Sequence, residues 1–177
     1  KVGEMMYKFN VCESIPMKYY NELNNLRTLV EKVGSLKVIK TSMRPGRPKH
    51  LKVSNEITGV FFYKNVKTCI IKKKNDIISP KLVIEYSNIP CVFSGKPKLI
   101  LAHKMYGYCY FDKKGEYGIS NRDNYVIVDY SEKDMEILNK FLNLPCIIKL
   151  FDATRYRMRY LERYIFDFIP NITSLPD

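Results

Sequence analysis

The segment from Arg44 to His50 has the residue types and spacing best suited to chemistry in this sequence. Pro45, Gly46 and Pro48 exclude a helix or an inner strand and favour a stiff loop. From such a loop, arginine side chains can bind phosphates in a forked geometry or contact the O6 and N7 edge of guanine. An ordinary solvated turn is the alternative. The predicted nucleic-acid-binding residues of this segment are Arg44, Arg47, Lys49 and His50.

Aromatic side chains lie beside cations in a second segment. His103 and Lys104 come directly before Tyr106 and Tyr108. Such an arrangement can stack on exposed bases or pack against sugar and phosphate, and we include these four residues as candidates. Alternating tyrosines equally suit a strand that buries one face and leaves its hydroxyls in water, and this packing role is the favoured one.

A third candidate is the polar turn at Asn121, Arg122 and Asp123. Asn and Arg can make bidentate contacts to base edges, so Asn121 and Arg122 join the predicted site. The same residues are equally typical of ordinary turn hydrogen bonding.

The positive charge of the chain is concentrated in one stretch. The formal net charge is +12, and the 38 residues from Lys37 to Lys74 contain eleven Lys and Arg residues against Glu56 alone. A basic footprint of this kind indicates a polyanionic partner, and nucleic acid is favoured over an anionic membrane because the stretch has no amphipathic helical pattern. The run Lys72, Lys73 and Lys74 belongs to this footprint, although lysines also keep strand edges solvated.

The sequence contains no recognisable catalytic motif. It therefore does not decide whether this chain has enzymatic activity of its own. Its two histidines stand in unrelated contexts, and no glycine-rich phosphate loop or nucleophile motif occurs. The five cysteines have no metal-ligand spacing, which predicts free, mostly buried thiols in a reducing compartment and no metal site. Asp76, Glu85 and Lys81 suggest a metal-dependent nuclease only loosely.

The pattern of apolar residues predicts an α+β fold with a curved, mainly antiparallel sheet. A helix is expected from Ser14, with Pro16 in its first turn, to Gly34. A short strand at Leu36 to Ile39 and further strands rich in Val, Ile, Tyr and Phe follow, with a hairpin turn at Asp112 to Gly115. These further strands are expected at 60–63, 68–71, 81–86, 98–102, 108–111 and 125–128.

Helices are expected to close the domain. Ser131 is the predicted cap of a helix that ends before Pro145. From Phe151 onward, Thr154, Met158, Leu161, Ile165 and Phe168 recur every three or four residues, which predicts a helix with one core-facing stripe.

Length and composition fit one domain of 177 residues with three parts. These are an N-terminal helical segment (1–36), a basic β-rich core (37–130) and C-terminal helices (131–170). No apolar run approaches the length of a membrane span, so an intracellular protein without a membrane partner is expected. Because residue 1 is Lys rather than Met, the chain is expected to be a piece of a longer polypeptide.

Three stretches of the sequence resemble the TaqI-like target-recognition domains of adenine-N6 DNA methyltransferases and restriction-modification enzymes. They are Lys96 to His103, Gly118 to Ile127, and the closing Tyr160 to Tyr164 with Phe168 to Pro170, within a resemblance that extends from about Lys37 to Pro170. The resemblance implies a duplex-DNA reader that acts with a methyltransferase catalytic domain, in cis or in trans. S-adenosylmethionine would then be the cofactor of the parent enzyme and not of this chain.

The sequence therefore predicts a DNA-binding domain that gives sequence specificity to such an enzyme. Two alternatives remain open. One is the small metal-dependent nuclease, and the other is a viral or structural module that binds single-stranded nucleic acid or protein, with Tyr106 and Tyr108 as stacking platforms.

Overall fold

The computed structural model describes residues 6, 16, 18–41, 49–74, 77–103, 108–121, 124–154 and 160–175. Its α-helices are α1 (Tyr20–Val33), α2 (Glu132–Leu142) and α3 (Pro145–Leu150), and its 3-10 helices are η1 (Phe151–Thr154), η2 (Arg163–Phe168) and η3 (Ile172–Ser174). Its strands are β1 (Ile39–Lys40), β2 (Val53–Ser54), β3 (Tyr63–Lys74), β4 (Ile77–Ser87), β5 (Lys98–Ala102), β6 (Cys109–Asp112), β7 (Gly118–Ile119) and β8 (Asn124–Ile127).

The described strands form two four-stranded sheets. The central sheet has the order β1-β8-β5-β6, and the hairpin sheet has the order β2-β4-β3-β7. Their pairings are antiparallel apart from that of β3 with β7, which is parallel. With the helices at the two ends of the chain, this arrangement confirms the predicted mainly antiparallel α+β fold.

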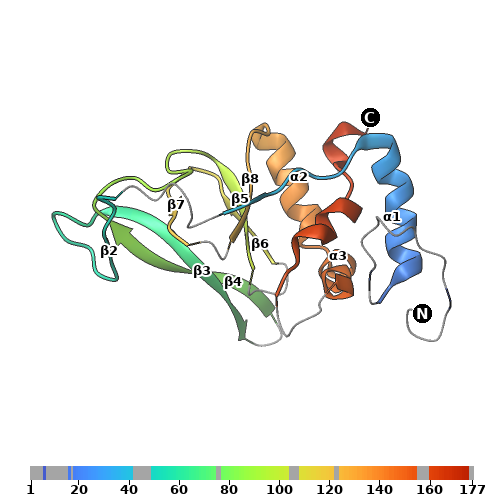
Figure 1. Cartoon of the computed structure of the whole chain (residues 1–177), viewed down its shortest axis with the longest axis horizontal. Coiled ribbons are helices and arrows are strands. Elements are labelled where there is room, and N and C mark those ends of the chain that lie inside the picture. The colour runs from blue at the N-terminus through green and yellow to red at the C-terminus, as the bar shows by residue number, and fades with distance from the viewer. Residues whose placement is uncertain are drawn as a thin grey trace.

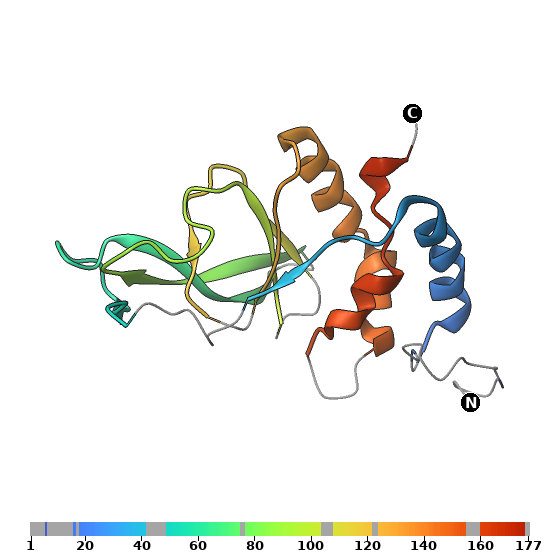
Figure 2. The same cartoon turned by 45° about the horizontal axis from the view of Figure 1, so that its top comes forward.

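The central sheet is the middle one of three layers, with helices on one face and the hairpin sheet on the other (Figures 1 and 2). Successive side chains of a strand point to opposite faces, and β5 shows this directly. Leu99 and Leu101 pack in the core with the helices, whereas Ile100 and Ala102 pack in the core between the sheets. Because β5 is covered on both faces, all five of its residues are buried.

The hairpin of β3 and β4 is longer than its neighbours. Its pairing runs from Tyr63 opposite Ser87 to Lys74 opposite Ile77, with an irregularity after Val66. Strand β7 pairs with β3 at residues 65–66, and β2 pairs with β4 at residues 86–87. Toward Lys74 the hairpin therefore continues as a two-stranded ribbon without a third strand among the described residues. Pro80 lies in this part of β4, opposite Ile71, which fits the preference of proline for strands that have a neighbour on one side only.

Helix α1 starts later than predicted and ends where predicted. Pro16 lies before the helix rather than in its first turn, and Ser14 lies outside the described residues. Tyr19 adopts a left-handed backbone with φ of 54°, which breaks the helical path just before Tyr20. Gly34 ends the helix with φ of 78°, and its N–H donates to the carbonyl of Val30 at 2.8 Å.

The prediction of one helix from Phe151 to Phe168 is wrong. Short 3-10 helices occupy both ends of this segment, and Glu162 between them has an extended backbone. The N–H of Leu161 donates to the carbonyl of His103 at 2.7 Å instead of to a helical partner. Burial of Leu161, Ile165 and Phe168 in the core is as predicted, while Met158 lies outside the described residues.

The predicted hairpin turn after Asp112 and the predicted helix cap at Ser131 had different outcomes. Gly115 has a positive φ of 67°, as expected for the turn after Asp112, but this turn is not a hairpin. Strands β6 and β7 belong to different sheets, so the turn carries the chain from one layer to the next. The cap at Ser131 is confirmed, because its hydroxyl accepts a hydrogen bond from the Asp134 N–H at 3.1 Å.

Candidate nucleic-acid interface

The end of β1 is hydrogen-bonded to Asn121 and Asn124, the two described residues on either side of positions 122–123. Thr41 donates its N–H to the carbonyl of Asn124 at 2.9 Å, and its hydroxyl lies 2.8 Å from the carbonyl of Asn121 and 2.9 Å from that of Asn124. The buried amide of Asn124 also donates to the carbonyls of Asn121 and Lys67, each at 3.3 Å. These bonds fix the residue before the basic loop against the predicted Asn121 turn.

His103 lies at the same end of the central sheet. It follows Ala102, which pairs directly with Asn124 in the ladder of β5 and β8. The imidazole stacks on the ring of Tyr125 with a centroid distance of 5.8 Å and meets the edge of Tyr160 at 4.9 Å. We call Lys40, Thr41, His103, Asn121, Asn124, Tyr125 and Tyr160 the sheet-end cluster.

Tyr125 is the buried centre of the sheet-end cluster. Its hydroxyl donates to the carbonyl of Leu161 at 2.7 Å, and the ammonium of the exposed Lys40 lies 5.7 Å from its ring centroid. Burial raises the pKa of the Tyr125 phenol, and the nearby charge of Glu162 raises it further, against an opposing effect of Arg163. The neutral phenol therefore keeps its hydrogen bond, and the ring offers Lys40 a cation–π contact.

The sheet-end cluster brings together the points at which several candidate segments meet the described chain. Thr41 directly precedes residues 42–48, His103 precedes 104–107, and Asn121 precedes 122–123. Of the predicted site residues, His103 and Asn121 are themselves in the cluster. Those that lie outside the described residues are Arg44, Arg47, Lys104, Tyr106 and Arg122.

Lys49 and His50 lie apart from the sheet-end cluster, beside the first residues of the hairpin sheet. Asn88 holds this segment, since its side-chain amide donates to the carbonyl of His50 at 2.9 Å and its Oδ1 accepts from the N–H of Lys52 at 2.7 Å. These bonds use the backbone. The side chains of Lys49, His50 and Lys52 are exposed and available to an anionic partner.

Acidic residues from other parts of the chain face two lysines of the basic stretch. The ammonium of Lys67 lies 3.2 Å from the carboxylate of the buried Glu85, and that of Lys64 lies 3.9 Å from Glu116. Glu85 is therefore held by an ion pair within the hairpin sheet. Asp76, its proposed partner in a nuclease site, lies outside the described residues, and the described part of the chain has no cluster of three potential metal ligands.

The remaining lysines of the stretch, Lys72, Lys73 and Lys74, are the last residues of β3. They lie opposite Ile77, Ile78 and Ser79 in the ladder, at the far end of the ribbon from Lys49 and His50. At about 3.3 Å per residue, the strand separates the two groups by roughly 30 Å. The basic residues of the stretch are thus distributed along the length of the hairpin in the chain, rather than at one point of it.

Tyr108 packs against the core between the two sheets and is half-buried. This position fits the packing role that the alternating tyrosines favoured. Cys69, Cys91 and Cys109 are buried thiols, and Cys146 is an exposed one, so no disulfide links the cysteines of the described ranges. The described helices include none that is long and apolar enough to cross a bilayer.

Searches with protein-family models, among curated proteins and among solved structures gave no match to this chain. The resemblance to target-recognition domains therefore depends on the residues of the sequence itself.

Sequence reasoning missed several members of the sheet-end cluster. Tyr125 was expected only as part of the strand at 125–128, and Lys40, Thr41 and Asn124 were not among the candidate residues. Thr41 and Asn124 are 83 positions apart, so no local pattern indicates their hydrogen bonds. A usable signal was the position of each residue at the boundary between an apolar strand and a polar segment.

Proposed function

We propose that this chain binds duplex DNA and supplies sequence recognition to an adenine-N6 DNA methyltransferase or a restriction-modification enzyme. The observation that carries the proposal is the sheet-end cluster, where Thr41, which precedes residues 42–48, is hydrogen-bonded to Asn121 and Asn124 near His103. Loops that start from a rigid sheet end can present their side chains with fixed spacing, which base recognition requires.

The shape and charge of the hairpin support duplex DNA in particular. The major groove of B-DNA admits a two-stranded β-ribbon, and β3 with β4 forms such a ribbon. Exposed cations at Lys40, Lys49 and Lys52 can bind the phosphates that position a protein on the duplex. A methyltransferase domain in cis or in trans would hold S-adenosylmethionine and carry out the methyl transfer. The role of this chain would then be to select the target sequence.

Salt dependence of binding tests the phosphate contacts. Each phosphate neutralised contributes about 0.9 to the slope of log affinity against log salt. Replacing Lys40, Lys49 and Lys52 with Gln should make this negative slope, measured with a fluorescent duplex, shallower by up to about 2.7. The matched control replaces Lys32, Lys133 and Lys140, three exposed lysines of α1 and α2, and should leave the slope nearly unchanged. Equal slopes for the two variants would contradict the proposed interface.

Sequence recognition needs a second test, because phosphate contacts alone carry no sequence information. Repeated selection from a random duplex library should enrich one short motif that contains adenine. A library that stays random through selection would remove the recognition part of the proposal. Preference for single-stranded probes would favour the alternative single-strand binder instead.

A further inference from the structure

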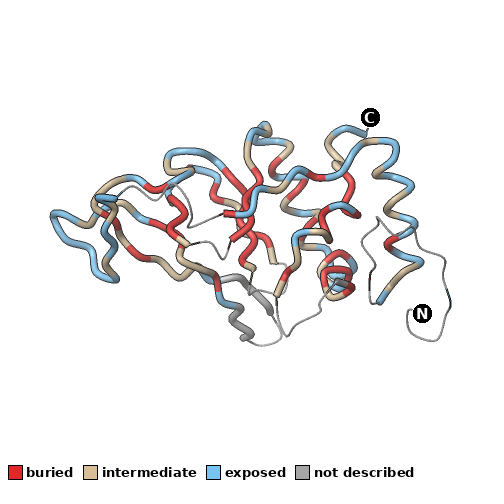
Figure 3. Tube along the Cα trace, viewed as in Figure 1, coloured by how far each residue is buried: buried red, intermediate tan, exposed pale blue. Residues whose placement is uncertain are grey.

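The loop between β2 and β3 lies at the end of the molecule farthest from the helices, and most of it is exposed (Figures 1 and 3). It carries large apolar residues. Ile57 is 62% exposed, Val60 is 63% exposed and Phe62 is 50% exposed. We call residues 55–62 the apolar loop. Sequence reasoning placed Val60 to Phe62 in a strand, but β3 begins at Tyr63, so these residues project before the ladder starts.

Hydrogen bonds give the apolar loop a defined shape. The hydroxyl of Thr58 accepts from the N–H groups of Val60 at 3.3 Å and Phe61 at 3.0 Å, and the Thr58 N–H donates to the carbonyl of Phe61 at 2.9 Å. The N–H of Phe62 donates to the carbonyl of Ser87, which ties the base of the loop to β4. The apolar side chains are therefore held outward by a preformed turn, which lowers the entropy lost on binding.

The surroundings of the apolar loop indicate the chemistry of its partner. Lys49 and Lys52 lie beside its base in the segment that Asn88 holds, whereas Lys64, which follows it on β3, is paired with Glu116. Glu56 is the single acid of the loop itself. Apolar groups within a cationic collar fit a partner with an apolar interior behind an anionic rim. The base stack of a duplex, between its phosphates, has this character.

The geometry of the hairpin allows the loop and the ribbon to contact one duplex. Strand β3 has 12 residues, and at about 3.3 Å per residue it spans roughly 36 Å. One helical turn of B-DNA covers about 34–36 Å. The apolar loop and the far end of the ribbon can thus lie over sites about one turn apart on the duplex.

We propose that Ile57 and Val60 insert between neighbouring base pairs of the duplex and unstack them. Apolar wedges of this kind bend the duplex and allow it to contact more of the protein. The inference rests on the proposed duplex binding and adds a defined contact to it.

Permanganate reactivity tests the wedge, because permanganate oxidises thymines that have lost their stacking. The probe is an end-labelled duplex of mixed sequence, so the target site need not be known. The unmodified chain should create reactive thymines, and the double variant Ile57→Ser with Val60→Ser should lose them while it still binds the duplex in a salt-dependent way. The control, Ile137→Ser with Leu144→Ser, removes two exposed apolar side chains elsewhere and should keep the reactivity.

Three outcomes would overturn the wedge. Salt-dependent binding without reactive thymines would overturn it and leave the proposed function intact. Absence of any duplex binding would remove both proposals. Binding of anionic phosphatidylserine vesicles that is abolished in the Ile57/Val60 variant, with unchanged thymine reactivity, would assign the loop to a lipid surface.

Discussion

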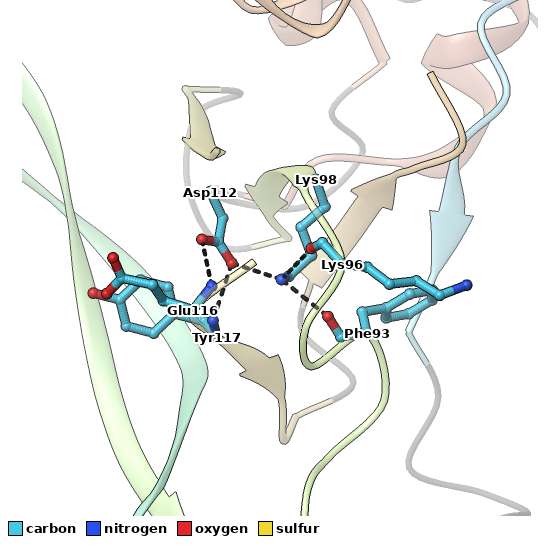
Figure 4. Close-up of polar contacts among 6 residues, drawn as sticks. All are labelled: Phe93, Lys96, Lys98, Asp112, Glu116 and Tyr117. Carbon is cyan, nitrogen blue, oxygen red and sulfur yellow. Dashed lines mark hydrogen bonds and ion pairs between the residues drawn. The ribbon is translucent and has the colours of Figure 1, made fainter. Parts of the chain in front are cut away.

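The ammonium of Lys98 lies 2.6 Å from Oδ2 of Asp112, and both side chains are buried between β5 and β6 (Figure 4). Lys98 also donates to the carbonyls of Phe93 at 3.1 Å and Lys96 at 3.0 Å. The carboxylate accepts in turn from the N–H groups of the turn that follows β6, those of Glu116 and Tyr117. The pair therefore joins two loops to the edge of the central sheet. The ammonium of Lys98 has three hydrogen-bond acceptors, and both carboxylate oxygens of Asp112 accept hydrogen bonds. Burial lowers the pKa of Lys98, against the opposing effect of Asp112.

Replacing Lys98 with Met should strongly destabilise the fold. The change leaves a buried carboxylate without its cation and two carbonyls without a donor, and breaking a buried pair in this way costs about 3–5 kcal/mol. The measurement is the free energy of unfolding from urea titration. Lys113→Met is the matched control, because Lys113 is half-exposed and pairs with Glu132 at 2.7 Å and Glu136 at 3.1 Å. A loss for Lys98→Met no larger than for the control would contradict a structural role of the pair.

Gly118→Ala should weaken the parallel pairing of β7 with β3. A Cβ at this position would overlap Oδ1 of Asn65 and lie 2.9 Å from Cβ of Cys91. Because Asn65 and Cys91 are both buried, neither can move away freely, and overpacking of this kind costs about 1–3 kcal/mol. The loss should appear in urea titration. Gly59→Ala is the control, since nothing lies within 4 Å of the added methyl group, and its stability should stay close to that of the unmodified chain.

Alkaline pH should destabilise the chain partly through Cys69. Burial raises the pKa of its thiol from an ordinary value of 9.0 to about 12. Between these values the unfolded chain loses the proton while the folded chain keeps it, so the free energy of unfolding falls as pH rises. Cys69→Ala should make the fall between pH 9 and 10.5 shallower by up to about 1.4 kcal/mol per pH unit. Cys146→Ala, which removes an exposed thiol, should leave the slope as it was.

The sequence predicted the elements that depend on neighbouring residues, namely strand β5 and the two helix ends at Gly34 and Ser131. Strand β5 has the predicted bounds because the four apolar residues after Lys98 form a compact run that is covered on both faces of the sheet. Gly34 ended its helix and Ser131 began its helix as expected, since a positive φ and a side-chain cap are properties of single positions.

Long-range pairing explains what the sequence did not predict. The chain order of strands does not show that β6 and β7 enter different sheets, because the partner of β7 is β3, more than forty residues earlier. The apolar stripe from Leu161 to Phe168 has helical spacing, but the carbonyl of His103 takes the N–H that a helix would have used. The candidate site also depends on long-range contacts, because Thr41 is hydrogen-bonded to residues 80 and 83 positions later in the sequence.

Tyr125→Phe should lower the stability of the sheet-end cluster while keeping its aromatic packing. The phenylalanine ring can keep the stack with His103, whereas the buried carbonyl of Leu161 loses the hydroxyl that donates to it at 2.7 Å. An unsatisfied buried acceptor costs about 1–3 kcal/mol, so urea titration should show a loss of this size. Because Leu161 also bonds to the backbone of His103, amide hydrogen exchange should rise at Leu161 while β5 stays protected. Unchanged exchange at Leu161 would show that the Tyr125 hydroxyl does not hold this segment to the central sheet.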